Sequence, residues 1–240
     1  MAGFKQFWYV ACESHTLTQR KPLAVQILDE WIVCFRDEVG KPSAFRDRCI
    51  HRNGLLSRGL VADGCLTCSY HGWRYDSSGR VVDIPSEGGR EAAQNKRLEA
   101  HTFQTVERDG YVYVLLEQGE LTRDPHPMPH FREDGWQNIR LVHDFENDVS
   151  NCVENFIDIP HTAYVHEGIF RKDHVTYQNE DSNLGSFSWF LNPKKEPVHH
   201  TDSFYMPNVT HVAYRVGNGK RVEYLITSQS IPVTDTSTRV

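Results

Sequence analysis

The sequence lacks an apolar run long enough to cross a membrane. Its 240 residues contain no uninterrupted stretch of about eighteen apolar residues, which is near the minimum for a transmembrane helix. The N-terminus, MAGFKQFWYVACESH, also lacks the basic, apolar and small-residue regions of a signal peptide. We therefore expect a cytoplasmic protein that has no membrane partner.

Basic charge and cysteine are also scarce. The 26 lysines and arginines are outnumbered by 32 acidic residues, which gives a net charge of −6 and argues against nucleic acid as a partner. Six cysteines are few for this length, and in a reducing compartment we expect them to be free or bound to metal. The sequence has no internal repeat or low-complexity segment, and its length suits one large or two modest globular domains.

The first half of the sequence is rich in short β patterns. Residues 23–35 are typical of two strands joined by a turn, and residues 102–106 and 110–116 are typical of a hairpin. No long helical period interrupts these patterns. We therefore expect an all-β domain over residues 1–118.

The composition changes after this domain. Residues 119–136 carry three prolines at alternate positions, which predicts an extended connector. The remaining residues, 137–240, combine one helix candidate with several strand patterns, so the fold class we predict for the whole chain is α+β. The predicted strands of this second domain are 139–145, 186–191, 211–216 and 222–227.

The helix candidate of the second domain is residues 150–161. Ser150 can cap its N-terminus, and Val153 and Ile157 fall on the same apolar face at helical spacing. Pro160 should end or kink the helix near its last turn.

Two short loops of the first domain each offer one thiol and one imidazole. CIHR contributes Cys49 and His51, and CSYHGW, which is separated from His51 by sixteen residues, contributes Cys68 and His71. Two thiolates on one iron and two neutral imidazoles on the other make the Rieske type of iron–sulfur centre. A structural zinc site that uses Cys65 with Cys49, Cys68 and His71 is the alternative.

A second group of polar residues follows about ninety residues later, in ENFIDIPHTAYVH. On a helix, Glu154, Asp158 and His161 would share one face, and His166 must be brought back from beyond Pro160. Two imidazoles and one carboxylate on one side of Fe(II) leave positions open for dioxygen and substrate. On spacing alone, a polar helix face with two ordinary histidines remains an equal alternative.

Together the two motifs resemble one family. Residues 49–85 resemble the Rieske domain of the Rieske non-haem iron oxygenases. The order Asn155, Asp158, His161, His166 is similar to the mononuclear-iron motif of the same family, and it lies beyond a Pro-rich connector as that family's layout requires. The opening FWYVA is similar to the family's N-terminal strand, so the resemblance covers most of the chain.

The resemblance implies the catalytic (alpha) subunit of the single-subunit type. A Rieske domain would be followed by a helix-grip-like catalytic domain that holds mononuclear Fe(II) on His161 and His166. Asp158 would connect this iron to His71 of a neighbouring copy in a head-to-tail homotrimer, and Asn155 would line the site. The four residues implied to hold the [2Fe–2S] cluster are Cys49, His51, Cys68 and His71.

The function implied by the resemblance is that of a terminal oxygenase. Electrons would come from a reductase or ferredoxin, and O2 would react with a small hydrophobic, aromatic substrate. We favour hydroxylation or oxidative demethylation, which are monooxygenase reactions, over ring cis-dihydroxylation by a dioxygenase. Two functions of a different class stay open: a Rieske electron-transfer protein without oxygenase activity, and a zinc-stabilised binding module.

This chain departs from the family's pattern at two places. Ile50 stands between the first cysteine and histidine, where the usual residue is proline; this position is not a ligand, so loop stiffness changes rather than coordination. The family's third iron ligand is an aspartate on a helix well after the histidines, and no such helix candidate follows His166. We therefore name no third ligand and expect the catalytic domain to be incomplete, the alternative being iron held by two histidines and water.

Overall fold

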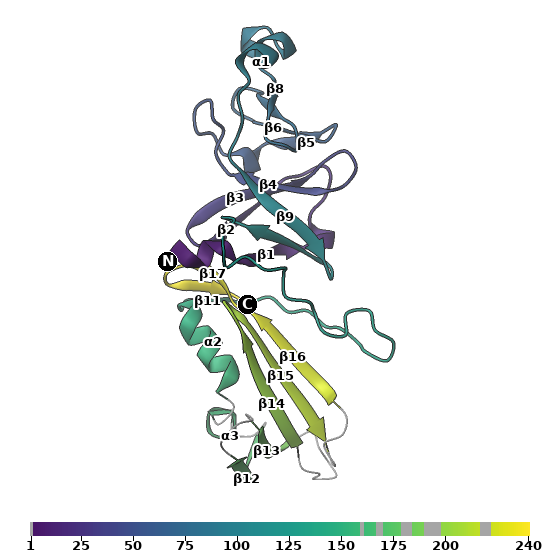
Figure 1. Cartoon of the computed structure of the whole chain (residues 1–240), viewed down its shortest axis with the longest axis vertical. Helices are drawn as coiled ribbons and strands as arrows, with labels where there is room; N and C mark the ends of the chain where they lie inside the picture. Colours follow the sequence, from purple (N-terminus) through teal and green to yellow (C-terminus); the bar gives the residue numbers. More distant parts are fainter. Residues whose placement is uncertain (1, 159–160, 167–169, 179–183, 190–197, 217–221) are drawn as a thin grey trace. The chain divides into compact units, whose positions relative to one another are not determined.

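The chain folds into two compact units, Met1–Gln137 and Asn138–Val240. Figure 1 shows the computed structural model, which describes residues 2–158, 161–166, 170–178, 184–189, 198–216 and 222–240. The division falls at the end of the Pro-rich segment. The domain limits that we predict at residues 118 and 136 stay predictions.

The larger sheet of the first unit has six strands in the order β1-β10-β9-β4-β3-β2, and all neighbours are antiparallel. The hairpin β2–β3 turns on Leu28 and Asp29, whose φ angles of 51° and 63° suit the twist of antiparallel strands. Both hairpins expected from the sequence are present. The strands are β1 (Trp8–Glu13), β2 (Leu23–Ile27), β3 (Glu30–Arg36), β4 (Pro42–Arg46), β9 (Thr102–Arg108) and β10 (Tyr111–Leu115).

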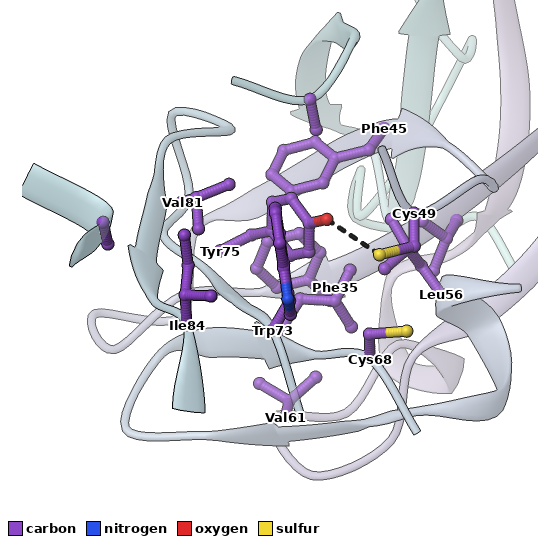
Figure 2. Close-up of a cluster of buried hydrophobic side chains, with 14 residues drawn as sticks. Phe35, Phe45, Cys49, Leu56, Val61, Cys68, Trp73, Tyr75, Val81 and Ile84 are labelled. Carbon is purple, nitrogen blue, oxygen red and sulfur yellow. Dashed lines mark hydrogen bonds between the residues drawn. The ribbon is translucent and has the colours of Figure 1, made fainter. Parts of the chain in front are cut away.

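A smaller antiparallel sheet carries the second cysteine–histidine loop. Its order is β5-β6-β7-β8, with β5 (Leu60–Ala62), β6 (Cys65–Thr67), β7 (Arg74–Tyr75) and β8 (Val81–Asp83). One apolar core joins the two sheets. Phe45 of the larger sheet lies edge-on to Phe35 at 5.0 Å and to Tyr75 of the smaller sheet at 6.4 Å between ring centroids (Figure 2).

The first unit also contains one α-helix that the sequence patterns did not predict. This helix, α1 (Arg90–Lys96), follows two glycines and ends at Arg97, whose φ is 50°. Ala93 is its buried residue and contacts the core described above. A single buried alanine produces little hydrophobic periodicity in the sequence. The all-β prediction for this domain therefore missed the helix. Short 3-10 helices complete the unit: η1 (Ala2–Gln6), η2 (Ser14–Thr16), η3 (Leu56–Arg58) and η4 (Pro85–Glu87).

The connector runs without regular structure. Residues 116–143, all of them described, contain no helix or strand. Hydrogen bonds attach its first part to the first unit: the Thr122 hydroxyl donates to the Gln6 carbonyl at 3.0 Å, and Met128 N–H donates to the Asp109 carboxylate at 2.9 Å. The strand predicted at 139–145 is wrong except for its last two residues, because only these pair with another strand.

The second unit is built on an antiparallel five-stranded sheet in the order β12-β13-β14-β15-β16, and α2 (Val149–Ile157) lies along β14 and β15 (Figure 1). A three-stranded sheet in the order β11-β18-β17 and a short helix, α3 (Thr162–Val165), complete it. The strands are β11 (Asp144–Phe145), β12 (Phe170–Gln178), β13 (Leu184–Trp189), β14 (Val198–Tyr205), β15 (Val209–Val216), β16 (Val222–Gln229), β17 (Ile231–Thr234) and β18 (Ser237–Arg239).

Helix α2 begins and ends earlier than predicted. Its N-cap is Asp148, not Ser150, because the Asp148 carboxylate accepts a hydrogen bond from Asn151 N–H at 2.9 Å. The helix stops at Ile157, with Asp158 as its C-cap. The prediction that the helix continues to His161 is therefore wrong.

Candidate metal centres

The first cysteine–histidine loop is closed at its base by a buried carboxylate. Asp47 is 1% exposed, and its side chain accepts hydrogen bonds from Ser57 N–H at 2.8 Å and from the Ser57 hydroxyl at 2.6 Å. Inside this closure, Cys49 and Gly54 are joined by a backbone hydrogen bond of 2.8 Å. These contacts hold residues 49–54 as a tight turn with His51 near its tip.

The second loop is a tight turn between β6 and β7. Cys68 N–H donates to the Trp73 carbonyl at 2.8 Å, and Gly72 N–H donates to the Cys68 carbonyl at 3.0 Å. Gly72 has a φ of 73°, a conformation that glycine adopts without steric cost. The turn fixes the distance between Cys68 and His71.

The two loops bring the four predicted cluster residues together. Cys49 and Cys68 are each 2% exposed, and Figure 2 shows them on opposite loops at the same edge of the core. The His51 and His71 rings lie 4.7 Å apart between centroids, His51 half-buried and His71 exposed. The thiols therefore lie inside and the imidazoles at the rim, an arrangement that would place one iron deeper than the other.

One atom at this site lacks the partner that its burial demands. His51 Nδ1 is buried and has no hydrogen-bond partner within the described residues. An unsatisfied buried polar group costs about 1–3 kcal/mol, and coordination to a metal would satisfy it. Desolvation lowers the pKa of His51, with the neighbouring His71 adding to this effect, which favours the neutral imidazole that metals bind.

The sulfur atoms have surroundings that suit thiolates bound to a cation. Burial raises the pKa of Cys68, and the nearby Cys49 raises it further, whereas backbone N–H groups of Tyr70 and His71 that donate to the sulfur act in the opposite direction. Two adjacent buried thiolates are unfavourable without a compensating positive charge. A bound iron–sulfur cluster supplies that charge, so the residues present fit the group.

Two aromatic residues that the sequence did not single out contact the cluster ligands. The Tyr75 hydroxyl lies 3.0 Å from Cys49 Sγ, and the Trp73 ring stacks on the His51 ring at 4.7 Å with an interplanar angle of 4°. Both aromatic side chains are buried. Tyr75 lies on β7 and Trp73 directly precedes this strand, so both side chains point to its inner face. A strand of two residues is too short for this alternation to be recognised from the sequence.

The structure does not bring Cys65 into this site. Cys65 and Cys68 are three residues apart on and just after β6, so their side chains leave opposite faces of the strand. The Cys65 thiol contacts the Arg74 side chain instead. The zinc set that needed Cys65 is therefore not assembled.

The second candidate site lies around the end of α2. The His161 and His166 rings are 5.4 Å apart between centroids, on either side of α3. His161 Nδ1 hydrogen-bonds the backbone carbonyl of Asp158, and the Asp158 carboxylate lies 3.6 Å from the same nitrogen. Because the carbonyl oxygen can only accept, Nδ1 of His161 carries the proton, and Nε2 is the nitrogen that can bind a metal.

Asn155 and Glu154 are exposed on α2, and within the described residues Asn155 makes no hydrogen bond to either histidine. The predicted common face of Glu154, Asp158 and His161 is wrong because the helix ends before Asp158. Among the described residues, no three His, Cys, Asp or Glu side chains converge on one metal position, and this includes the first site, where each iron would have two protein ligands. The two histidines therefore remain a pair.

Known proteins are similar to this chain in sequence and in fold. Residues 7–104 match the family described as Rieske [2Fe-2S] domain. The chain is 31% identical over 176 residues to the oxygenase component of dicamba O-demethylase from Stenotrophomonas maltophilia, covering 72% of this chain and 50% of that protein. It is 32% identical over 165 residues to the vanillate O-demethylase oxygenase subunit of a Pseudomonas species, covering 68% and 45%.

The fold is similar to the crystal structure of dicamba monooxygenase bound to dicamba. The TM-score is 0.80 at 24% identity, over 98% of this chain and 75% of that chain. The first unit is thus a Rieske domain in both sequence and fold. The chain belongs to the Rieske non-haem iron oxygenases, so the predicted family and the predicted α+β fold are confirmed.

The predicted cofactors, a Rieske cluster and a mononuclear iron, are the cofactors of this family. The chain spans about half the length of the two demethylases that it matches. Among the described residues, no helix is both long and apolar enough to span a membrane.

Proposed function

We propose that this chain is the terminal oxygenase component of a monooxygenase that hydroxylates or oxidatively demethylates a small aromatic substrate. The observation that carries this proposal is the pair of buried thiols facing two imidazoles, one of which presents a buried nitrogen without a partner. The matched relatives named as O-demethylases support the reaction class.

The first site holds the cluster. Cys49 and Cys68 bind one iron, and His51 and His71 bind the other. When bound, the two metal centres supply one-electron transfer and activation of O2. The protein keeps water from the sulfur atoms by burial and leaves the histidine edge exposed, where an electron donor can approach.

The second site holds mononuclear Fe(II) on His161 and His166. The backbone carbonyl of Asp158 fixes the tautomer of His161 and keeps its Nε2 free for iron. The Asp158 carboxylate, 54% exposed, is accessible to His71 of a neighbouring copy, which agrees with a head-to-tail homotrimer. Asn155 lines the approach to the iron.

The partners follow from this chemistry. A reductase or ferredoxin delivers electrons to the exposed histidine edge, and O2 and the aromatic substrate meet at the second site. We place the protein in the cytoplasm, where its six cysteines stay free of disulfides. We favour the monooxygenase reaction over ring cis-dihydroxylation by a dioxygenase, because the two matched relatives are named as O-demethylases.

Metal analysis separates the oxygenase from a Rieske electron carrier that lacks the second iron. The protein is purified without oxygen, and iron, labile sulfide and the EPR spectrum after dithionite reduction are measured. We expect about two irons with sulfide in a Rieske-type signal and a further iron that His161→Ala or His166→Ala removes. His15→Ala is the matched control, because this side chain is 75% exposed and lies in neither site.

An iron content that stops at two and ignores both substitutions would leave the electron-transfer protein as the function. Zinc without sulfide would contradict both iron sites.

A further inference from the structure

One face of the five-stranded sheet ends in a group of buried polar side chains. Thr210 of β15 pairs with Ser228 of β16, and two residues further along, the Ser230 N–H donates to the Asn208 carbonyl at 2.9 Å. Residues two apart on a strand share a face, so these four residues belong to one face of the sheet. Each of them is at most 7% exposed. We call Asn208, Thr210, Ser228 and Ser230 the polar patch.

Helix α2 covers the face that carries the polar patch. On the same face of β15, Val212 and Tyr214 are 3% and 5% exposed, whereas Ala213 and Arg215 on the opposite face are only partly buried. The helix lies along β14 and β15 (Figure 1), and the more buried face is the one that it covers. The polar patch therefore lies in the interior of the second unit.

Ser230 carries a buried hydroxyl that has no partner within the described residues. The residue is 0% exposed, and its Oγ makes no hydrogen bond there. Its backbone carbonyl, by contrast, accepts a hydrogen bond from the Asn208 side-chain amide at 3.0 Å. An unsatisfied buried hydroxyl destabilises the folded chain, so a group that binds to Oγ gains more than it would at an exposed serine.

The polar patch and the histidine pair of the second site lie at opposite ends of α2. Ser230 directly precedes β17, which pairs with β18, and the Thr238 hydroxyl of β18 donates at 2.9 Å to the Asn147 carbonyl just before the helix. His161 and His166 follow its other end. The nine residues of α2 measure about 14 Å. A substituted aromatic ring that reacts at the histidines therefore extends toward the patch with its farthest substituent.

The surroundings of the polar patch disfavour a charged substituent. Among the described residues, this face of β14, β15 and β16 and the whole of α2 carry no lysine or arginine. Arg215 lies on the opposite face, where it donates to the Thr201 hydroxyl at 2.8 Å. Burial raises the pKa of Tyr214, and the Asp202 carboxylate raises it further, so this negative charge acts on the face of the patch. An anion would be buried here without a counter-charge, whereas an uncharged hydroxyl or carbonyl fits.

We propose that the Ser230 hydroxyl binds an uncharged hydroxyl or carbonyl group of the aromatic substrate and so determines which end of the substrate faces the histidine pair. The inference rests on the oxygenase function proposed above and specifies its substrate class. Ser230 Oγ can accept from a substrate hydroxyl or donate to a substrate carbonyl. Either bond gives the buried hydroxyl the partner that it lacks within the described residues.

The test is a comparison of three small aromatic probes by isothermal titration calorimetry on the full chain, purified without oxygen. The probes are 4-methoxyphenol, methoxybenzene and 4-methoxybenzoate. We expect wild type to bind 4-methoxyphenol about tenfold more tightly than methoxybenzene, which corresponds to one hydrogen bond. The benzoate should bind more weakly than the phenol, because its charge has no partner at the patch.

Ser230→Ala should remove the preference for the phenol. We expect it to weaken binding of 4-methoxyphenol about tenfold and to leave methoxybenzene unchanged. Ser203→Ala is the matched control, because Ser203 pairs with His211 on the opposite face of the sheet and should leave all three affinities unchanged. Since Ser230→Ala removes an unsatisfied hydroxyl, the midpoint of urea unfolding without ligand should not decrease.

Three outcomes would overturn the proposal. One is a wild type that binds the phenol no more tightly than methoxybenzene, which includes no measurable binding of either probe. Another is an equal loss of both probes in Ser230→Ala, since this would mean a change of packing. The third is unchanged phenol binding together with a lower urea midpoint, which would show that the hydroxyl binds a buried water instead of substrate.

Failure of the oxygenase function is recognised separately. Binding of the probes requires no turnover, whereas the iron bound by His161 and His166 is measured by metal analysis as described above. Phenol binding that depends on Ser230 in a protein without this iron would contradict the oxygenase and not the binding site. Iron that His161→Ala removes, together with phenol binding that ignores Ser230→Ala, would overturn the binding site alone.

Discussion

The two candidate metal sites differ in how much of the fold holds them in place. The first lies between two tight turns over a core shared by two sheets, and its cysteines are 2% exposed. The second follows the last turn of α2, a helix that is buried on one side only, and Asp158 and His166 are exposed. The first site is therefore preorganised by packing, whereas the second depends on a short segment around α3.

Removal of single ligands should show this difference most strongly. We expect Cys49→Ala to abolish the whole cluster and its visible spectrum, since the cluster would be held by ligands from both loops. His166→Ala should remove at most one iron and leave the Rieske EPR signal unchanged. Iron and sulfide assays with EPR on both variants provide the measurement, and a cluster signal that disappears in His166→Ala would contradict the independence of the two sites.

Loss of the loop closure should have the next largest effect. Ser57→Ala removes the hydroxyl that donates to the buried Asp47 carboxylate at 2.6 Å, and an unsatisfied buried acceptor costs about 1–3 kcal/mol. Urea unfolding should report this decrease in the free energy of unfolding of the Rieske unit.

Ser78→Ala is the control for this experiment. It removes a hydroxyl that also donates to a carboxylate at 2.6 Å, that of Asp76, but in an exposed turn. We expect a loss below about 0.5 kcal/mol. Equal decreases in the free energy of unfolding for the two variants would show that the burial of Asp47 does not strengthen its hydrogen bond with Ser57.

Removal of the N-cap of α2 tests how much this cap stabilises the helix that precedes the second site. Asp148→Ala removes the side chain that accepts the Asn151 N–H and should cost about 1 kcal/mol. Ser150→Ala, at the position that the sequence pattern favoured as the cap, should change stability by less than about 0.5 kcal/mol. Urea unfolding followed by far-ultraviolet circular dichroism compares the two, and a larger effect at Ser150 would contradict the observed cap.

Sequence patterns predicted the features that depend on neighbouring residues. The two hairpins of the first sheet and the four cluster residues lie in turns whose composition and spacing are local. Tyr75 could not be predicted, because it contacts a cysteine 26 positions away through the fold. The predicted strand at 139–145 failed for a related reason: its apolar pattern is real, but strand pairing depends on β18, far along the chain.

The smallest expected effects concern one ion pair in each unit. Arg36 holds Glu107 at 2.7 Å while also donating to three backbone carbonyls, and Arg239 holds Asp144 at 2.7 Å in a more exposed position. A hydrogen bond from each arginine lowers the pKa of its carboxyl partner. Each pair therefore stabilises the folded state above the carboxyl's unfolded pKa, and this stability is lost as the pH falls through the lower, folded pKa.

Neutralising each carboxylate should compare the two pairs directly. Because both are partly exposed, we expect Glu107→Gln to cost up to about 1 kcal/mol at neutral pH and Asp144→Asn less than about 0.5 kcal/mol. Each variant should lose part of the acid dependence of stability, since its carboxyl no longer takes up a proton on unfolding. Urea unfolding at neutral pH and near pH 3 measures both quantities. A larger cost for Asp144→Asn would mean that the additional carbonyl contacts of Arg36, rather than its pairing with Glu107, fix that arginine in place.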